Sequence, residues 1–388
     1  SVTISGGTIS DNEADFGGGV SADQVTVDNL TVSGNSAKTS GGGIFSFNGS
    51  LSLTNSTVRE NTADGDGGGI FNGGVLTTEG STISGNTAAG GGEAWYFPNQ
   101  SGPARDIRLE SVTGIALDAS GNLYISEGGY YGRYMIYRVD TWGIAHIIAG
   151  RGVRGFSGDG GPATEAYLDD PSGLTLDIKG NLYFADRGNN RIRKIDTSGM
   201  ITTVAGGNQE GFAGDGGPAI EALLSHPNSL HFDAAGNLYF ADVNNNRIRK
   251  VDTNGIITTE AGNGENGIGG DNGPAVEAQL IIHGFFADQA GNFYISQGGS
   301  HNSIRKVDTA GIIRRIAGAP GTNRGLGGDG GPAIEAQLDY PTAMVTDQCG
   351  ILFFGDGNAS NTGPPRIRKI DSSGIITTVA GPGLEATG

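Results

Sequence analysis

Four Gly-Asp-Gly-Gly-Pro-type loops are the most regular group of residues in this sequence that could do chemistry. They place one aspartate each in nearly identical settings: Asp159, Asp215, Asp271 and Asp329. Aspartate among glycines is typical of calcium loops, but a calcium ion needs several oxygen ligands converging on it, and each loop brings one carboxylate. A proline and then a glutamate follow each loop, as in the first turn of a helix. The loops therefore predict a turn that starts a short helix, with calcium as the alternative.

A basic motif, Asn-Asn-Arg-Ile-Arg-Lys, also recurs and could bind anions. The arginines and lysines of this motif occur once in each repeat, close in sequence to an aspartate that also recurs. We therefore expect Arg191 and Arg247 to pair with Asp186 and Asp242. Nucleic-acid binding needs clustered positive potential, whereas the net charge is -17. The sequence therefore predicts ion pairs inside the repeats and no nucleic-acid partner.

Histidines are the remaining candidates for a metal site. His226 and His283 fall near the start of corresponding strands in adjacent repeats, which places them near one end of the assembled repeats. A third ligand for zinc is not evident, so these two residues and the four loop aspartates are the only, weak, metal candidates. No Gly-x-Ser-x-Gly elbow is present, and Cys349 has no histidine partner. We predict no catalytic residues and no cofactor.

Two different repeats must position these residues. In the first, Ser-Gly-Asn-x-Ala is followed by Gly-Gly-Gly, with short runs of alternating apolar residues between. One such unit cannot bury its inner face alone, so the units must stack as coils, with parallel strands and a ladder of asparagines at one corner. The ladder residues are Asn12, Asn35, Asn61 and Asn86, spaced 23, 26 and 25 residues apart.

This pattern resembles the right-handed parallel β-helix repeats of polymorphic outer-membrane proteins and autotransporter passenger domains. The resemblance implies a short β-helix over residues 1–95, about four coils long, that is incomplete at its N-terminus. Residues 96–103 are the expected linker.

A longer repeat occupies residues 104–388. The aspartate that closes its basic strand falls at Asp140, Asp196, Asp252, Asp308 and Asp371. Each repeat contains four candidate strands, which is the content of a propeller blade, and closing a ring of blades protects strand edges. The fold class is therefore all-β, a β-helix followed by a β-propeller. A five-blade ring is our first choice, and a sixth blade completed from outside the visible repeats is the alternative.

The motifs Gly-Asn-Leu-Tyr-Phe-Ala-Asp, Asn-Asn-Arg-Ile-Arg-Lys and Gly-Asp-Gly-Gly-Pro-Ala, in this order, resemble NHL repeats, especially the bacterial and teneurin-like version. The resemblance carries alternatives with it. Some NHL propellers bind RNA through a basic face, an amidating lyase with an NHL-like propeller holds zinc with histidines, and related lactonases hold metals with carboxylates.

Composition limits the setting. The 72 glycines among 388 residues indicate many tight turns, and the single cysteine allows no internal disulfide. No stretch of 18 apolar residues exists, so this segment is not expected to insert into a membrane. Acceptor patterns for N-glycosylation occur at Asn29, Asn48, Asn55, Asn99 and Asn358.

The first residues already match a coil strand, so we expect further coils, or a neighbouring molecule docked head to tail, to cover that end. The favoured hypothesis is a non-catalytic structural or adhesive protein, either extracellular or on a bacterial cell surface. A subunit of a self-assembling filament is one version of this hypothesis. Its expected partners are copies of itself, other surface proteins or glycans. The alternative is a secreted carbohydrate-active or lyase-type enzyme that uses the propeller channel or the solenoid groove.

Overall fold

A computed structural model describes residues 2–381 apart from 23, 47–50, 65–67, 73–75, 89–100, 108, 130–132, 208, 289, 300, 320–323 and 358–363. The chain divides into two compact units, residues 1–108 with 142–146, and residues 109–141 with 147–388. None of the described helices is long and apolar enough to cross a membrane. The regular structure is almost entirely strand, which confirms the all-β prediction.

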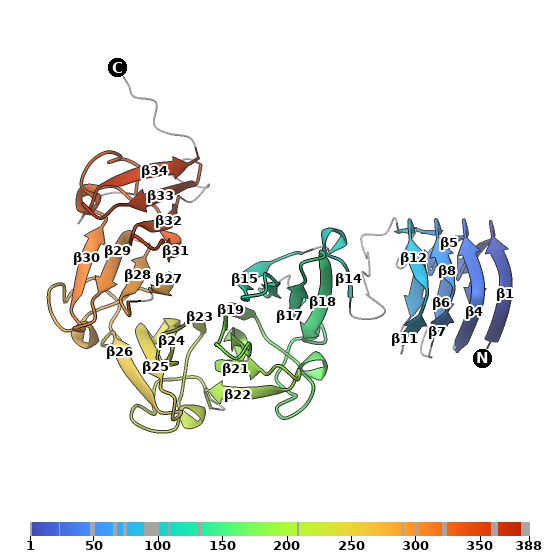
Figure 1. Ribbon diagram of the computed structural model, residues 1–388, viewed down its shortest axis with the longest axis horizontal. Coiled ribbons are helices and arrows are strands. Elements are labelled where there is room, and N and C mark those ends of the chain that lie inside the picture. The colour runs from blue at the N-terminus through green and yellow to red at the C-terminus, as the bar shows by residue number, and fades with distance from the viewer. Residues whose placement is uncertain are drawn as a thin grey trace, which may run out of the picture. The chain divides into compact units, whose positions relative to one another are not determined.

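The first unit is built from stacked coils of parallel strands (Figure 1). The largest sheet carries the order β11-β7-β4-β8-β12, and β1 pairs with β4. Inward residues of successive coils lie in register, as Ile4 does with Val27 and Val27 with Leu53. The strands of this sheet are β1 (Val2–Ser10), β4 (Val25–Ser33), β7 (Leu51–Thr54), β8 (Thr57–Arg59), β11 (Leu76–Glu79) and β12 (Thr82–Ser84).

Two smaller sheets complete the coils. One has the order β13-β9-β5-β2 and the other β10-β6-β3, and neighbouring strands in both are parallel. Glycine is required where they approach each other, because a Cβ on Gly42 would collide with the carbonyl oxygens of Thr62 and Gly68. The strands are β2 (Glu13–Phe16), β3 (Val20–Ser21), β5 (Ser36–Ser40), β6 (Ile44–Ser46), β9 (Thr62–Ala63), β10 (Ile70–Asn72) and β13 (Thr87–Ala88).

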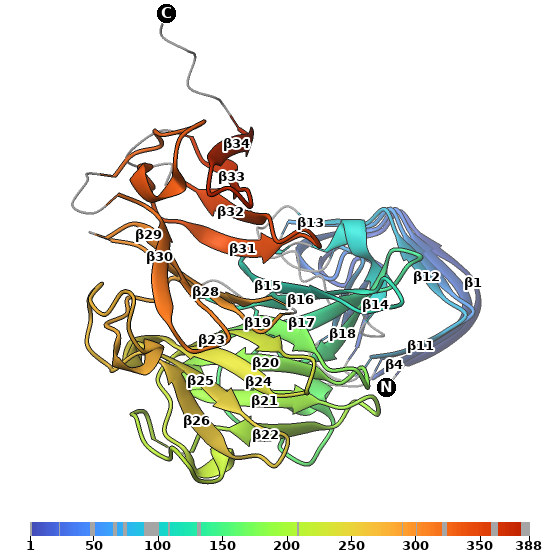
Figure 2. The ribbon, with the colours of Figure 1, turned by 60° about the vertical axis from the view of Figure 1, so that its left-hand side comes forward.

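The described part of the remaining chain forms five antiparallel sheets in sequence order, the first with five strands and the others with four, as the propeller prediction requires (Figure 2). Blade 1 has β15 (Val112–Leu117), β16 (Leu123–Glu127), β17 (Met135–Val139) and β18 (Ile144–Ala149), and β14 (Ser101–Pro103) pairs with β18. Blade 2 has β19 (Pro171–Leu176), β20 (Leu182–Asp186), β21 (Arg191–Ile195) and β22 (Ile201–Ala205).

Blades 3 to 5 repeat this order. Blade 3 has β23 (Pro227–Phe232), β24 (Leu238–Asp242), β25 (Arg247–Val251) and β26 (Ile257–Ala261). Blade 4 has β27 (Gly284–Ala287), β28 (Phe293–Gln297), β29 (Ser303–Val307) and β30 (Ile313–Ala317). Blade 5 has β31 (Thr342–Thr346), β32 (Leu352–Asp356), β33 (Arg366–Ile370) and β34 (Ile376–Ala380).

Each Gly-Asp-Gly-Gly-Pro loop leads into a single 3-10 turn with Pro immediately before it. These turns are η2 (Ala163–Glu165), η4 (Ala219–Glu221), η6 (Ala275–Glu277) and η7 (Ala333–Glu335). Each turn is the middle of a Pro-Ala-x-Glu-Ala-x-Leu stretch, which we call the docking segment (residues 162–168, 218–224, 274–280 and 332–338).

The docking segments join neighbouring blades. Ala219, Ala222 and Leu224 are buried in one apolar cluster with Ala185 and Ile192 of the preceding blade. The amide of Gly206, just after the outer strand of that preceding blade, donates to the carbonyl of Ala219 at 3.0 Å. Blade-to-blade cohesion therefore comes from a small-residue segment seated on the face of the blade before it.

Ring closure at five blades is not seen in the described part of the chain. Ile367 of the last blade is 45% exposed, whereas its counterpart Ile192 in blade 2 is fully buried. On the first blade, Leu117 is 68% exposed. Both faces would be covered in a closed five-blade ring, and the sixth blade stays a prediction.

Candidate functional site

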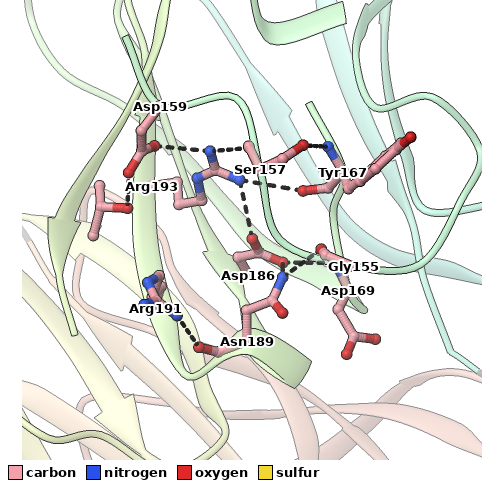
Figure 3. Close-up of polar contacts among 10 residues, drawn as sticks. Gly155, Ser157, Asp159, Tyr167, Asp169, Asp186, Asn189, Arg191 and Arg193 are labelled. Atoms are coloured by element: carbon pink, nitrogen blue, oxygen red, sulfur yellow. Dashed lines mark hydrogen bonds and ion pairs between the residues drawn. The ribbon is translucent and has the colours of Figure 1, made fainter. Parts of the chain in front are cut away.

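A buried arginine held between two aspartates is the most regular polar arrangement of the propeller. In blade 2, the guanidinium of Arg193 lies 2.8 Å from Asp159 and 3.3 Å from Asp186, and both Arg193 and Asp186 are fully buried (Figure 3). The same two terminal nitrogens also donate to the carbonyl oxygens of Ser157 at 2.8 Å and Tyr167 at 3.3 Å. Arg193 thus ties together a loop aspartate, a strand aspartate and the docking segment.

Both carboxylates are further engaged. Asp186 accepts hydrogen bonds from the Asp169 amide at 2.7 Å and from Asn189 at 2.9 Å. The second oxygen of Asp159 accepts the hydroxyl of Thr203 at 2.6 Å. Buried charges persist only when they are paired and hydrogen-bonded, and Asp186 and the two terminal nitrogens of Arg193 meet this condition, whereas Nε of Arg193 has no hydrogen-bond partner among the described residues.

The same arrangement recurs in other blades with substitutions. Arg249 lies between Asp215 at 2.7 Å and Asp242 at 3.1 Å, and Arg368 between Asp329 at 2.6 Å and Asp356 at 3.0 Å. In blade 4, Gln297 takes the strand position, so Arg305 pairs with Asp271 at 2.7 Å. In blade 1, Tyr137 donates to Glu127 at 3.1 Å in place of the arginine and aspartate.

The prediction that Arg191 and Arg247 pair with Asp186 and Asp242 is corrected by this geometry. The ion pairs to these aspartates come from Arg193 and Arg249, two residues further along the strand. Arg191 instead stacks on Phe156, with its guanidinium carbon 3.9 Å from the ring centroid. Arg247 stacks on Phe212 at 3.6 Å. The stacked pairs hold the outer loop against the blade through cation–π attraction.

Burial and hydrogen bonding act in opposite directions on the pKa of the strand aspartates. Burial raises the pKa of Asp186 to about 6, against hydrogen bonds from the Asp169 amide, Asn189 and Arg193 that lower it. Burial likewise raises the pKa of Asp356 to about 6 and raises the pKa of Asp242. These carboxyls titrate above the ordinary aspartate range because of where the fold places them.

The residues considered for a metal site lie apart. Each loop aspartate faces its own arginine, and among the described residues no group of three or more His, Cys, Asp or Glu side chains is placed to hold a metal ion. Nδ1 of His226 lies 2.9 Å from the side-chain amide nitrogen of Asn244. His283 packs against Tyr340 with ring centroids 5.5 Å apart, and burial lowers its pKa.

The asparagines of the first unit form a continuous hydrogen-bonded ladder. The side-chain amide of Asn12 donates to Asn35, that of Asn35 to Asn61, and that of Asn61 to Asn86, each at 2.8 Å. Asn35 and Asn61 are fully buried. Each also donates to a carbonyl of the coil before it, as Asn61 does to Val32 at 3.0 Å. The ladder therefore satisfies backbone groups that the corner of each coil leaves unpaired.

Of the glycosylation candidates, Asn29 and Asn55 are exposed. Both adopt positive φ at a corner of the coils. Asn48, Asn99 and Asn358 lie outside the described residues.

The sequence is similar to two known families and to several known proteins. Residues 152–213 and 207–268 match the teneurin NHL domain, and residues 29–46 match the Chlamydia polymorphic membrane protein repeat. Teneurin-1 of Gallus gallus is 29% identical over 276 residues, which is 62% of this chain and 10% of that protein. Teneurin-3 of Mus musculus is 27% identical over 328 residues, 78% of this chain and 11% of that protein. The chain thus spans about a tenth of the length of these relatives.

Solved structures with a similar fold include virginiamycin B lyase from Staphylococcus aureus, at 15% identity with a TM-score of 0.46, covering 74% of this chain and 75% of that one. An auxiliary nutrient binding protein from Bacteroides ovatus gives a TM-score of 0.49 at 14% identity, covering 71% of this chain and 61% of that one. Likeness at this level says nothing about activity.

Proposed function

We propose that this chain is a non-catalytic structural or adhesive repeat protein of the bacterial cell surface or extracellular space. One observation carries the proposal. In blades 2, 3 and 5 the recurring arginine and its two aspartates satisfy one another, as Arg193 does with Asp159 and Asp186. Groups that neutralise each other in this way hold the scaffold and leave its outer surface free to bind.

The coil unit supports a role in assembly. Among the described residues, Val2 on β1 is 36% exposed and Ile83 on β12 is 38% exposed, whereas Val27 and Val58 are fully buried. Open edges of parallel strands are templates for further strand pairing. We propose that the first coil of one molecule stacks on the last coil of another, as a right-handed parallel β-helix continued from copy to copy, which gives a head-to-tail filament.

The likeness to teneurin NHL domains supports the surface setting, and the proposal includes other surface proteins or glycans as ligands of the propeller. No cofactor is proposed, because the loop aspartates considered for calcium serve as counter-ions of buried arginines. The enzyme alternative has no residue set in the described part of the chain that favours it over this proposal.

A bead assay tests the proposal. Beads coated with the purified protein are expected to cluster with one another or with cell-surface extracts, while beads coated with albumin stay dispersed. Beads that carry the Ile83→Lys variant should cluster less, because a charge at the coil edge opposes stacking. Dispersed beads together with turnover of a polysaccharide or lactone substrate that a chelator stops would contradict the proposal and support the enzyme alternative.

A further inference from the structure

Four Asn-Gly pairs lie in one stretch of the chain, from the turn between β25 and β26 to the loop before η6. Asparagine followed by glycine is prone to spontaneous deamidation, because glycine has no side chain to hinder its own backbone nitrogen. The pairs begin at Asn254, Asn263, Asn266 and Asn272, and all four asparagines are exposed. Exposure therefore does not distinguish them, and their hydrogen bonds must.

The reaction requires a free glycine amide next to a free asparagine side chain. The glycine nitrogen loses its proton and attacks Cγ of the asparagine, which closes a succinimide ring and releases ammonia. Water then opens the ring at one of its two carbonyl groups, giving aspartate or isoaspartate. A hydrogen bond that holds either group must break before the attack, and one such bond slows the reaction by up to about tenfold.

The first and the last of the four pairs are held in turns. The amide of Gly255 donates to the carbonyl oxygen of Asp252 at 2.9 Å, and the side-chain amide of Asn254 donates to the carboxylate of Asp252 at 3.4 Å. In the last pair, the amide of Gly273 donates to the carbonyl oxygen of Gly270 at 3.2 Å. The attacking nitrogen is therefore engaged in both pairs.

The pair at Asn263 is held on one side only. The amide of Gly264 has no acceptor among the described residues. The side-chain oxygen of Asn263, however, accepts the amide of Glu265 at 2.8 Å, and its backbone carbonyl accepts the guanidinium of Arg247 at 2.7 Å. Attack on this side chain must disturb the bond to Glu265.

The pair at Asn266 is free on both sides. Within the described part of the chain, neither the side chain of Asn266 nor the amide of Gly267 has a hydrogen-bond partner. We infer that Asn266 is a site of spontaneous modification, where the folded protein converts asparagine to aspartate and isoaspartate. Asn263 follows more slowly, and Asn254 and Asn272 are protected. The inference does not depend on the proposed function.

The isoaspartate product changes a contact with blade 4. The carbonyl oxygen of Gly267 accepts the side-chain amide of Gln297 at 3.2 Å, and Gln297 is fully buried on β28. Isoaspartate adds one carbon to the main chain directly before Gly267, which moves this carbonyl away from Gln297. A buried amide that loses its partner destabilises the fold, so modification at Asn266 weakens blade 4.

Peptide mapping of protein aged at mildly alkaline pH tests the inference. A glutamate-specific protease cuts after Glu260, Glu265 and Glu277, and fragmentation of the peptides separates Asn266 from Asn272. Aspartate and isoaspartate should accumulate at Asn266 first, about tenfold faster than at Asn254 or Asn272. Asn266→Gln should remove this signal alone, because glutamine must close a larger ring. In urea-unfolded protein all four pairs should react at similar rates.

Two results for the aged, folded protein would overturn the site. One is faster modification at Asn254 or Asn272 than at Asn266, and the other is the same order of rates in the folded and the unfolded protein. The consequence for blade 4 has its own measurement. Aged wild type should unfold at a lower temperature than aged Asn266→Gln, and equal temperatures at high isoaspartate content would contradict the loss of the Gln297 contact.

Discussion

Arg193 and Asp186 lie 3.3 Å apart with both side chains fully buried, on adjacent antiparallel strands of blade 2. A charge pair at this depth is costly to break, because the partner that remains is left buried without compensation. Substitutions in this pair therefore measure how much the repeated ion pairs contribute to the stability of the propeller.

Replacing Arg193 with methionine should destabilise the protein by about 3–5 kcal/mol, because Asp186 would be buried without a counter-charge. The matched control is Arg305→Met in blade 4. There Gln297 replaces the strand aspartate, and the remaining partner Asp271 is partly exposed, so the loss should be smaller. Urea unfolding followed by circular dichroism measures both. Equal losses for the two variants would show that the strand aspartate does not matter.

The asparagine ladder gives a second prediction. Asn61→Ala removes the side-chain amide that donates to the carbonyl oxygens of Val32 and Arg59. It also removes the side-chain oxygen that accepts from Asn35, and all these groups lie in a buried corner. Each buried group left unpaired costs about 1–3 kcal/mol. Asn12→Ala, at the exposed end of the ladder, should cost less. Hydrogen exchange of the first unit should show lost protection around Asn61 in the first variant only. Similar hydrogen-exchange protection in both variants would contradict the claim that the buried part of the ladder stabilises the first unit more than its exposed end.

Stability should depend on pH in two opposite ways. The folded pKa of Asp186 and Asp356 is about 6, above the unfolded value of 3.8, so their contribution is present below pH 3.8 and is lost as pH rises through about 6. Hydrogen bonds lower the pKa of turn aspartates, with Asn122 as the main donor to Asp118 and Ser198 to Asp196. Their contribution is present above pH 3.8 and is lost as pH falls below it.

The unfolding temperature should therefore rise as pH falls from 7 toward 5 and drop again below pH 4. Asp186→Asn should flatten the rise and leave the acid drop unchanged. A profile that falls steadily from pH 7 downward in the wild type would contradict the raised pKa values.

The repeats made the architecture predictable from the sequence. Each coil buries one face and each blade needs four strands, so period and alternation determine where strands begin and end. The asparagine spacing likewise predicted a ladder, which the hydrogen bonds from Asn12 to Asn86 describe. The short turn after each Gly-Asp-Gly-Gly-Pro loop followed from the proline.

The choice between Arg191 and Arg193 was not determined by pattern alone. Residues two apart on a strand point to the same side, so both arginines could face Asp186. Phe156, from a loop more than thirty residues earlier, occupies the place beside Arg191 and leaves Asp186 to Arg193. A signal was present in the repeats: the Arg193 position is arginine in blades 2 to 5, whereas the Arg191 position is Ser303 in blade 4.

The role of the loop aspartates was also beyond sequence reasoning. Asp159 lies 34 residues before Arg193, and only the folded blade brings them to 2.8 Å. The exposure of Ile367 could not be found from the sequence either, because Ile367 lies in the same Arg-Ile-Arg-Lys motif as its buried counterparts Ile192 and Ile248. Burial in a propeller depends on the neighbouring blade, which a single repeat does not reveal.

A double-mutant cycle on Arg193 and Asp159, measured with and without calcium, tests the central claim most directly. Arg193→Met, Asp159→Asn and the double variant should show a favourable coupling energy, and calcium should change the unfolding free energy of none of them. Additive losses, together with a calcium-dependent stabilisation of the wild type that Asp159→Asn removes, would contradict the claim and make the loop aspartates metal ligands.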